Sequence, residues 1–133
     1  MKKRYVLDSY ALLAYFQGEH GGAKVKEILK EASLAKALIH MSVINVGEVV
    51  YITSRKLGKV SSQALFKDIS LLPVQLVEAS MERVLIAANI KARYPISYGD
   101  SFAVALAKEL EATVVTGDPE FRKVENEVGV LWL

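Results

Sequence analysis

The chain has 133 residues, no cysteine and a formal net charge of +2 at pH 7, from 17 basic and 15 acidic side chains. A hydrophobic fraction of 52% with 24% charged residues excludes a disordered chain, and the lack of cysteine excludes a disulfide framework or a thiolate metal site. We expect a single domain over residues 1–133, long enough to bury a hydrophobic core.

The amino-terminal segment has basic residues before an apolar run, as a secretory signal does. Asp8 interrupts that run almost at once, and the apolar residues after it keep helical spacing, which argues against a signal peptide. No apolar run approaches the length needed to span a bilayer. We therefore expect a cytoplasmic protein that does not associate with a membrane.

Hydrophobic periodicity predicts strands that alternate with helices along the whole chain. Strands are predicted at Arg4–Leu7, Lys36–Ser42, Pro73–Glu78, Thr113–Thr116 and Gly129–Leu133. Helices are predicted at Ser9–Phe16, Gly22–Ala32, Ser42–Leu57, Ser61–Leu72, Ser80–Tyr94 and Ser97–Ala112, with a short one after Asp118. Because such alternation implies parallel strands joined by right-handed crossovers, we expect a three-layer α/β/α fold with a central, mostly parallel sheet.

Two aspartates follow predicted strands directly. Asp8 comes immediately after the first strand, and Asp118 comes two residues after the fourth. Sites in such sheets lie outside the carboxyl ends of the strands, where the strand order reverses. We therefore predict that the first and fourth strands flank this point and that both aspartates lie there.

Helix capping is the simpler interpretation of three acidic residues. Asp8 and Asp118 each precede a predicted helix, and Asp is a favoured N-cap. Ser97 and Asp100 have the spacing of a capping box. Capping alone and capping combined with a second role both remain open for these residues.

Glu48 lies on or beside the apolar face of its predicted helix, because Ile44 and Ile52 are its neighbours four residues away on either side. An unpaired carboxylate there would cost several kcal/mol. A salt bridge to Arg55, which requires the arginine to fold back along the helix, is the structural alternative. Binding of a metal ion is the functional one.

Taken together, these acids predict a cluster of four carboxylates at one end of the sheet: Asp8, Glu48, Asp100 and Asp118. Such a cluster would raise the pKa of its members unless a cation lay between them. Oxygen ligands without cysteine or a well-placed histidine favour Mg²⁺ or Mn²⁺ over zinc. Sequestering four acids would also leave the rest of the surface basic, which favours a polyanionic partner.

Four segments together resemble the PIN domain, and more narrowly the small ribonuclease toxins of the VapC type: "YVLDSYALLAYF", "SVINVGEVVY", "ISYGDSFAVALA" and "VVTGDPEF". The resemblance covers essentially the whole chain in order. It implies that the acidic quartet is Asp8, Glu48, Asp100 and Asp118, which would be both metal ligands and catalytic residues. Ser9 and Thr116 match the small hydroxyl positions of the family.

The resemblance further implies metal-dependent hydrolysis of RNA phosphodiester bonds, a homodimer, and a cognate antitoxin of a type II toxin–antitoxin pair. A PIN-like RNA-processing nuclease without an antitoxin, or a non-catalytic domain that binds RNA or protein, is the alternative. The apolar helices at 9–16 and 62–72 carry more large side chains than one small sheet needs, which is consistent with self-association.

Other phosphate chemistries fit the sequence less well. A phosphotransfer receiver needs an aspartate after the third strand, where only Glu78 is present. A phosphatase with an aspartyl nucleophile usually has a second aspartate two residues on, where this chain has Tyr10. The segment "GEHGGAK" lacks the Gly-Lys-Ser/Thr ending of a phosphate-binding loop.

Overall fold

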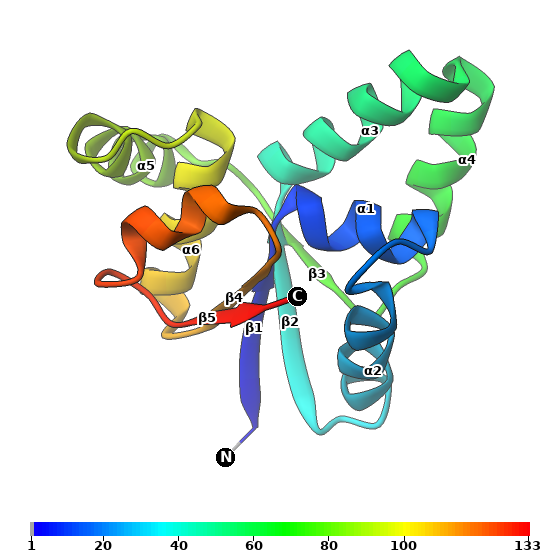
Figure 1. Ribbon diagram of the computed structural model, residues 1–133, viewed down its shortest axis with the longest axis horizontal. Coiled ribbons are helices and arrows are strands. Elements are labelled where there is room, and N and C mark those ends of the chain that lie inside the picture. Colours follow the sequence, from blue (N-terminus) through cyan, green and yellow to red (C-terminus); the bar gives the residue numbers. More distant parts are fainter. Residues whose placement is uncertain (1) are drawn as a thin grey trace.

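Five parallel strands form the central sheet of the molecule, in the order β3-β2-β1-β4-β5 (Figure 1). The structure is a computed structural model and describes residues 2–133. The strands are β1 Lys3–Leu7, β2 Ala37–Ser42, β3 Gln75–Val77, β4 Thr113–Thr116 and β5 Val130–Trp132. The predicted α/β class with a parallel sheet is confirmed, and every strand pair in the sheet is parallel.

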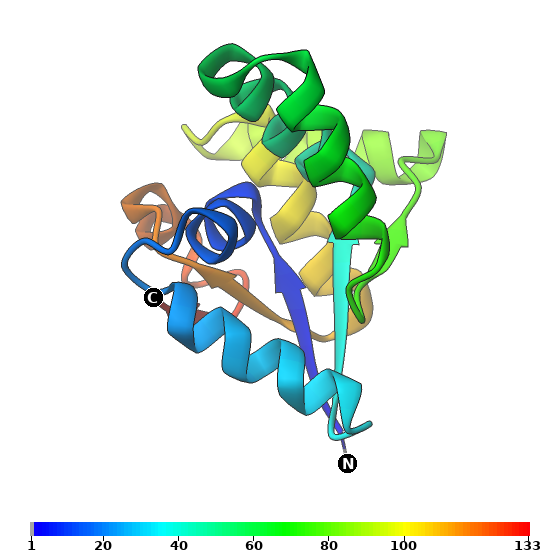
Figure 2. The same cartoon turned by 90° about the vertical axis from the view of Figure 1, so that its right-hand side faces the viewer.

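Helices cover both faces of this sheet. They are α1 Ser9–Gln17, α2 Gly22–Ser33, α3 Val43–Leu57, α4 Lys59–Ser70, α5 Met81–Arg93 and α6 Tyr98–Leu110, followed by a 3-10 helix η1 at Pro119–Val124. In Figure 1, α5 and α6 lie on one side of the strands and α1 to α4 on the other; Figure 2 shows α2 and α4 in front of the sheet. The predicted three-layer arrangement is therefore confirmed.

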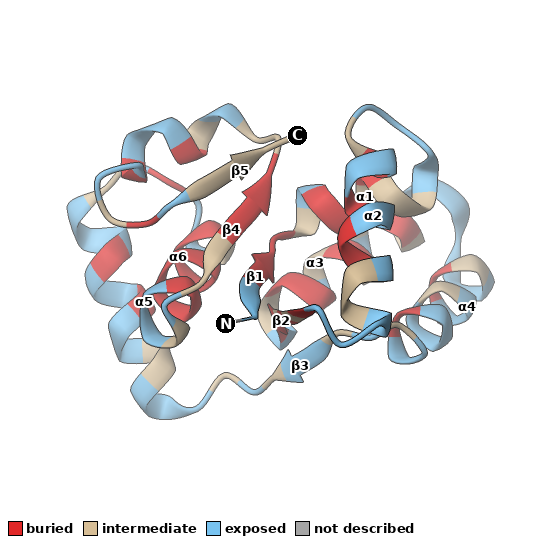
Figure 3. Cartoon of the chain, turned by 90° about the horizontal axis from the view of Figure 1, so that it is seen from below, coloured by how far each residue is buried: buried red, intermediate tan, exposed pale blue. Residues whose placement is uncertain are grey.

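The alternation of side chains along the strands produces two hydrophobic cores. Leu7 and Val115 point toward α1, α2, α3 and α4, whereas Val6 and Val114 point toward α5, α6 and η1. All four are fully buried, as expected for parallel strands covered on both faces. Figure 3 shows this buried layer between helices whose outer surfaces are exposed.

The predicted boundaries lie within two residues of the observed ones; the strand predicted at Pro73–Glu78, for example, is shortened to Gln75–Val77. The helix predicted from Ser61 begins at Lys59, because Gly58 both ends α3 and precedes α4 with a φ of 91°. That backbone conformation is accessible to glycine at little cost. The helix after Asp118 is a 3-10 helix of six residues.

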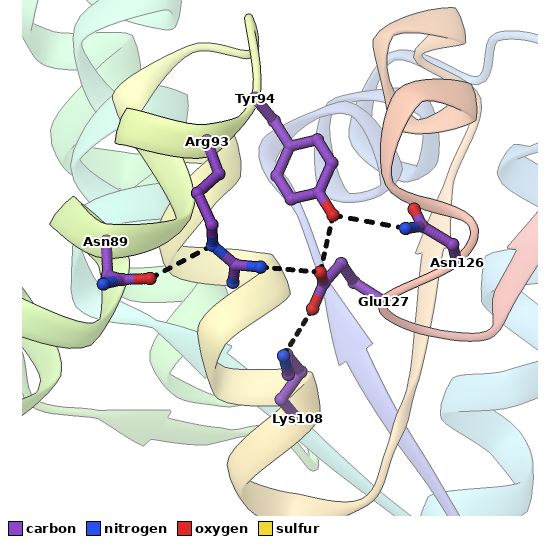
Figure 4. A network of polar contacts seen from close by, with 6 residues as sticks. All are labelled: Asn89, Arg93, Tyr94, Lys108, Asn126 and Glu127. Atoms are coloured by element: carbon purple, nitrogen blue, oxygen red, sulfur yellow. Dashed lines mark hydrogen bonds and ion pairs between the residues drawn. The ribbon is translucent and has the colours of Figure 1, made fainter.

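Glu127 links the carboxyl end of α5 to α6 through a network of polar contacts at the surface (Figure 4). Its Oε2 accepts hydrogen bonds from the Tyr94 hydroxyl at 2.6 Å and from Arg93 Nη1 at 3.1 Å, and its Oε1 accepts one from Lys108. These partners, Lys108 first, lower the pKa of Glu127 from 4.5 to about 2. A carboxyl whose pKa is depressed on folding stabilises the protein above its ordinary pKa, and that stabilisation is lost as the pH falls through about 2.

We expect Glu127→Gln to lower the free energy of unfolding at neutral pH by about 1 kcal/mol, since charge-assisted bonds to partly exposed partners are replaced by weaker neutral ones. Urea denaturation would measure this. Glu19→Gln is the matched control, because Glu19 is exposed and forms none of the side-chain hydrogen bonds or ion pairs among residues 2–133. Equal stability of the two variants would contradict the assigned role.

Among residues 2–133, none of the helices is both long and apolar enough to pass through a lipid bilayer.

Candidate active site

The strand order reverses between β1 and β4, which are hydrogen-bonded neighbours with Leu7 opposite Val115. Asp8 directly follows β1, and Asp118 follows β4 after one intervening residue, Gly117. The prediction that the first and fourth strands flank the switch point is confirmed. In Figure 1 this edge lies where α1 and α3 leave the sheet.

Asp8 is only 1% exposed and has a hydrogen bond to each carboxylate oxygen. Its Oδ1 accepts from the Ala11 backbone N–H at 2.9 Å, which makes Asp8 the N-cap of α1. Its Oδ2 accepts from the Thr116 hydroxyl at the end of β4. Burial raises the pKa of Asp8 to about 7, opposed by these two hydrogen bonds and reinforced by the charges of Asp100 and Asp118.

Thr116 connects the two aspartates at the ends of β1 and β4. While its hydroxyl donates to Asp8, it accepts a hydrogen bond from the backbone N–H of Asp118 at 3.0 Å. Asp118 is half-buried and caps η1 through a 2.9 Å bond from the Glu120 N–H to its Oδ1. The capping interpretation of both aspartates is therefore confirmed. The charge of Asp118 also lies close enough to Asp8 to repel it.

Asp100 lies in the first turn of α6 and is 6% exposed. Its backbone N–H donates to the Ser97 hydroxyl at 3.1 Å, as the predicted capping box requires. The pKa of Asp100 is raised to about 6, mainly by burial and then by the charges of Asp118 and Glu48, against the hydrogen bond with Ser97. Asp100 is therefore close enough to both acids to repel them.

Glu48 is held against the start of α6. The Asn45 amide group donates to Glu48 Oε1 at 2.7 Å and to the Gly99 carbonyl at 3.0 Å. A Cβ atom on Gly99 would lie only 2.4–2.6 Å from the Glu48 carboxylate, so this approach requires glycine. Burial raises the pKa of Glu48, the bond from Asn45 opposes this, and the charge of Asp118 adds to it.

The salt bridge considered between Glu48 and Arg55 does not form. Arg55 instead lies over the ring of Tyr51, 5.1 Å from its centroid. Across residues 2–133, none of the ion pairs includes any of the four predicted site acids.

The fold places each of the four predicted acids close enough to at least one other for their charges to repel: Asp8, Glu48, Asp100 and Asp118. Within the described part of the chain, no three His, Cys, Asp or Glu side chains are positioned as a ready metal site. The four acids nevertheless fit a hard divalent cation, because they offer carboxylate oxygens as ligands. None of them forms an ion pair with a lysine or arginine among residues 2–133.

Sequence reasoning missed two residues that shape this site, Asn45 and Gly99. Asn45 precedes Glu48 by three residues on a helix, a spacing that places two side chains on one face. This spacing could have identified Asn45 from the sequence. Nothing in the local sequence indicates that Gly99 lies beneath Glu48, because the contact joins two helices far apart in the chain.

The raised pKa of Asp8 predicts an unusual pH dependence for the metal-free protein. A folded-state pKa of about 7 against an ordinary 3.8 means that the folded state binds more protons between these values. Stability therefore falls as the pH rises through this range. We expect Asp8→Asn, which keeps an acceptor for the Ala11 N–H, to become more stable relative to the wild type as the pH rises. The difference in their free energies of unfolding should increase by about 2 kcal/mol from about pH 5 to about pH 8.

Denaturation in EDTA at several pH values would measure this gain. Comparison with the wild type at each pH cancels the contribution of His40, whose lowered pKa acts in the opposite direction. A difference in stability that does not change with pH would contradict the assigned environment of Asp8.

Comparison with known families decides the classification. The PIN domain model matches residues 5–127. The chain belongs to the PIN domain family. A comparison of this PIN domain with curated protein sequences finds no match.

Solved structures with the same fold include several toxin–antitoxin proteins. The PIN domain is similar to a chain of DNA-bound VapBC from Salmonella typhimurium (TM-score 0.74, 16% identity, 98% of each chain covered). It is similar to one of VapBC2 from Rickettsia felis bound to a promoter DNA fragment (0.72, 18%, covering 96% of this chain and 97% of that one). A third is Mycobacterium tuberculosis VapC20, described as a sarcin–ricin loop cleaving toxin (0.70, 16%, covering 92% and 95%).

Proposed function

We propose that this PIN domain is a divalent-metal-dependent endoribonuclease. Its metal ligands and catalytic residues are the four acids at the sheet edge: Asp8, Glu48, Asp100 and Asp118. The observation that carries the proposal is the burial of Asp8 and Asp100 next to further carboxylates, with no ion pair among residues 2–133 to either of them; burial and the neighbouring charges raise the pKa of both acids. An arrangement that is unfavourable in the empty protein becomes favourable when a cation neutralises it.

In this proposal Asp8 and Asp100 hold Mg²⁺ or Mn²⁺ directly, and Glu48 and Asp118 complete its coordination. Because hydrogen bonds hold Asp8, binding would require the Glu48, Asp100 and Asp118 carboxylates to turn toward it. An ion held there would supply stabilisation of the charge on a phosphodiester and would lower the pKa of an attacking water. The chain's own contribution is orientation, because the Ala11 N–H and the Thr116 hydroxyl fix both oxygens of Asp8.

RNA is the proposed substrate, and a cognate antitoxin is the proposed partner. Family membership and the fold shared with VapBC proteins support both. The similar M. tuberculosis protein is described as a sarcin–ricin loop cleaving toxin, and we propose a structured RNA as the first substrate to test. A small co-purifying protein that suppresses cleavage would identify the antitoxin, and its cationic segment could replace the metal among the carboxylates.

Self-association as a homodimer is also proposed. Of the two helices expected to carry surplus apolar surface, α1 buries or half-buries its large apolar side chains apart from Tyr10, whereas α4 leaves Phe66 50% exposed. Leu85 on α5 adds further exposed apolar surface at 62%. Such surface often marks an interface. Light scattering over a dilution series tests this proposal, and a monomeric mass at high micromolar concentration would refute it.

Cleavage of a structured RNA with Mg²⁺ or Mn²⁺, compared with an EDTA control, tests the activity. We expect cleavage that stops in EDTA and returns when metal is added back. Cleavage that persists in EDTA would contradict the proposed dependence on a metal ion. RNA binding without any cleavage would favour the alternative of a non-catalytic PIN-like domain.

A further inference from the structure

The exposed tyrosines of this chain all lie beside the proposed site. Of six tyrosines, three are exposed: Tyr10 at 37%, Tyr51 at 47% and Tyr98 at 46%. Tyr10 follows Asp8 by two residues, and Tyr98 immediately precedes Gly99, the residue that packs against the Glu48 carboxylate. Tyr51 follows Glu48 by three residues on α3, which places both on one face of that helix.

Tyr10 is held in place by a glycine beside the site. A Cβ atom on Gly117 would lie 2.3–2.8 Å from the ring and hydroxyl of Tyr10, so the ring packs directly on the Gly117 backbone. Since Gly117 immediately precedes Asp118, this contact places Tyr10 between the ends of β1 and β4.

The other two rings are also held by specific contacts. Tyr98 packs edge-on against Phe102, with ring centroids 5.0 Å apart and an interplanar angle of 73°. The guanidinium of Arg55 lies over the ring of Tyr51. A ring that is fixed before binding loses little conformational entropy when a ligand stacks on it.

We propose that Tyr10, Tyr51 and Tyr98 are stacking platforms for unpaired nucleotides of the RNA that this site would cleave. The proposal rests on the proposed function and names side chains that would hold its substrate. Aromatic rings stack on any base face, and such stacking is the usual means of holding single-stranded RNA. Bases in a continuous duplex are already stacked on each other and offer no free face to these rings.

Charge favours this mode of binding. Four ionised acids and one divalent cation would still leave a net negative charge near the phosphate backbone, so uncharged contacts add affinity close to the site. Stacking on tyrosine supplies such contacts, and Arg55 adds a positive charge beside the ring of Tyr51. The platforms predict a preference for unpaired over paired RNA, with little discrimination between bases.

Fluorescence anisotropy with a labelled single-stranded RNA of about a dozen nucleotides tests the proposal. The measurement uses Asp100→Asn protein with Mg²⁺, so that the RNA stays intact. Tyr51→Leu and Tyr98→Leu should each raise the dissociation constant about 5- to 100-fold, whereas the corresponding Phe variants should bind as the parent does. A paired version of the same RNA should bind more weakly.

Leu34→Ala is the control for loss of exposed apolar surface, because Leu34 is 56% exposed at the carboxyl end of α2, a helix that carries none of the four acids. It should leave RNA affinity unchanged. Leu variants of Tyr51 and Tyr98 that bind like the parent, or equal affinity for paired RNA, would overturn the proposal while the nuclease assignment stands. A wild-type protein that neither binds nor cleaves RNA would overturn both.

Discussion

Asp100→Asn is expected to reduce metal-dependent RNA cleavage by about 100-fold or more, because it removes one of the two acids proposed to hold the ion directly. The fold should be retained, since the Ser97 cap uses the backbone N–H of residue 100. In EDTA the variant should be as stable as the wild type or more stable, because it relieves repulsion from Asp118 and Glu48.

Cleavage rates and thermal unfolding in EDTA measure these two effects separately. Asp68→Asn is the matched control, because Asp68 is exposed on α4 and takes part in none of the ion pairs among residues 2–133. It should change neither quantity. Comparable cleavage by Asp100→Asn and wild type would remove Asp100 from the site.

Gly99→Ala is expected to reduce cleavage by about 10- to 100-fold without unfolding the protein, because small displacements of a catalytic group have effects of this size. The added methyl group would collide with the Glu48 carboxylate and with no other atom as near. Since that carboxylate is the end of a flexible side chain, it can move aside. It would then lose the hydrogen bond from Asn45.

A matched pair of variants tests this explanation. Gly47→Ala changes the residue next to Glu48 where nothing lies within 4 Å, and it should leave cleavage unchanged. In a Glu48→Gln background, Gly99→Ala should add little further loss, because both changes act through one carboxylate. Fully additive losses would show that Gly99 acts in some other way.

Local patterns were sufficient to predict the order and type of the elements. The alternation at Val6 and Leu7, and the capping residues Asp8, Ser42 and Ser97, are signals contained within a few neighbouring residues. The reversal of strand order also followed from the position of the aspartates after β1 and β4.

Contacts between distant segments could not be predicted in the same way. The bond from Thr116 to Asp8 joins residues 108 positions apart, and the bond from Asn45 to Gly99 spans 54. Burial of a carboxylate depends on these contacts, so the pKa of about 7 at Asp8 was not accessible from its neighbours in sequence. The rings of Tyr10 and Tyr98 were unremarkable until their exposure and packing were known.

The most direct test of the four-carboxylate site is a crystal of the protein with Mn²⁺, measured at the manganese absorption edge. We predict an anomalous peak between the Asp8 and Asp100 carboxylates, with Glu48 and Asp118 turned toward it, and no such peak in Asp100→Asn crystals. A saturating Mn²⁺ concentration that gives cleavage in solution but no peak at these residues would contradict the site.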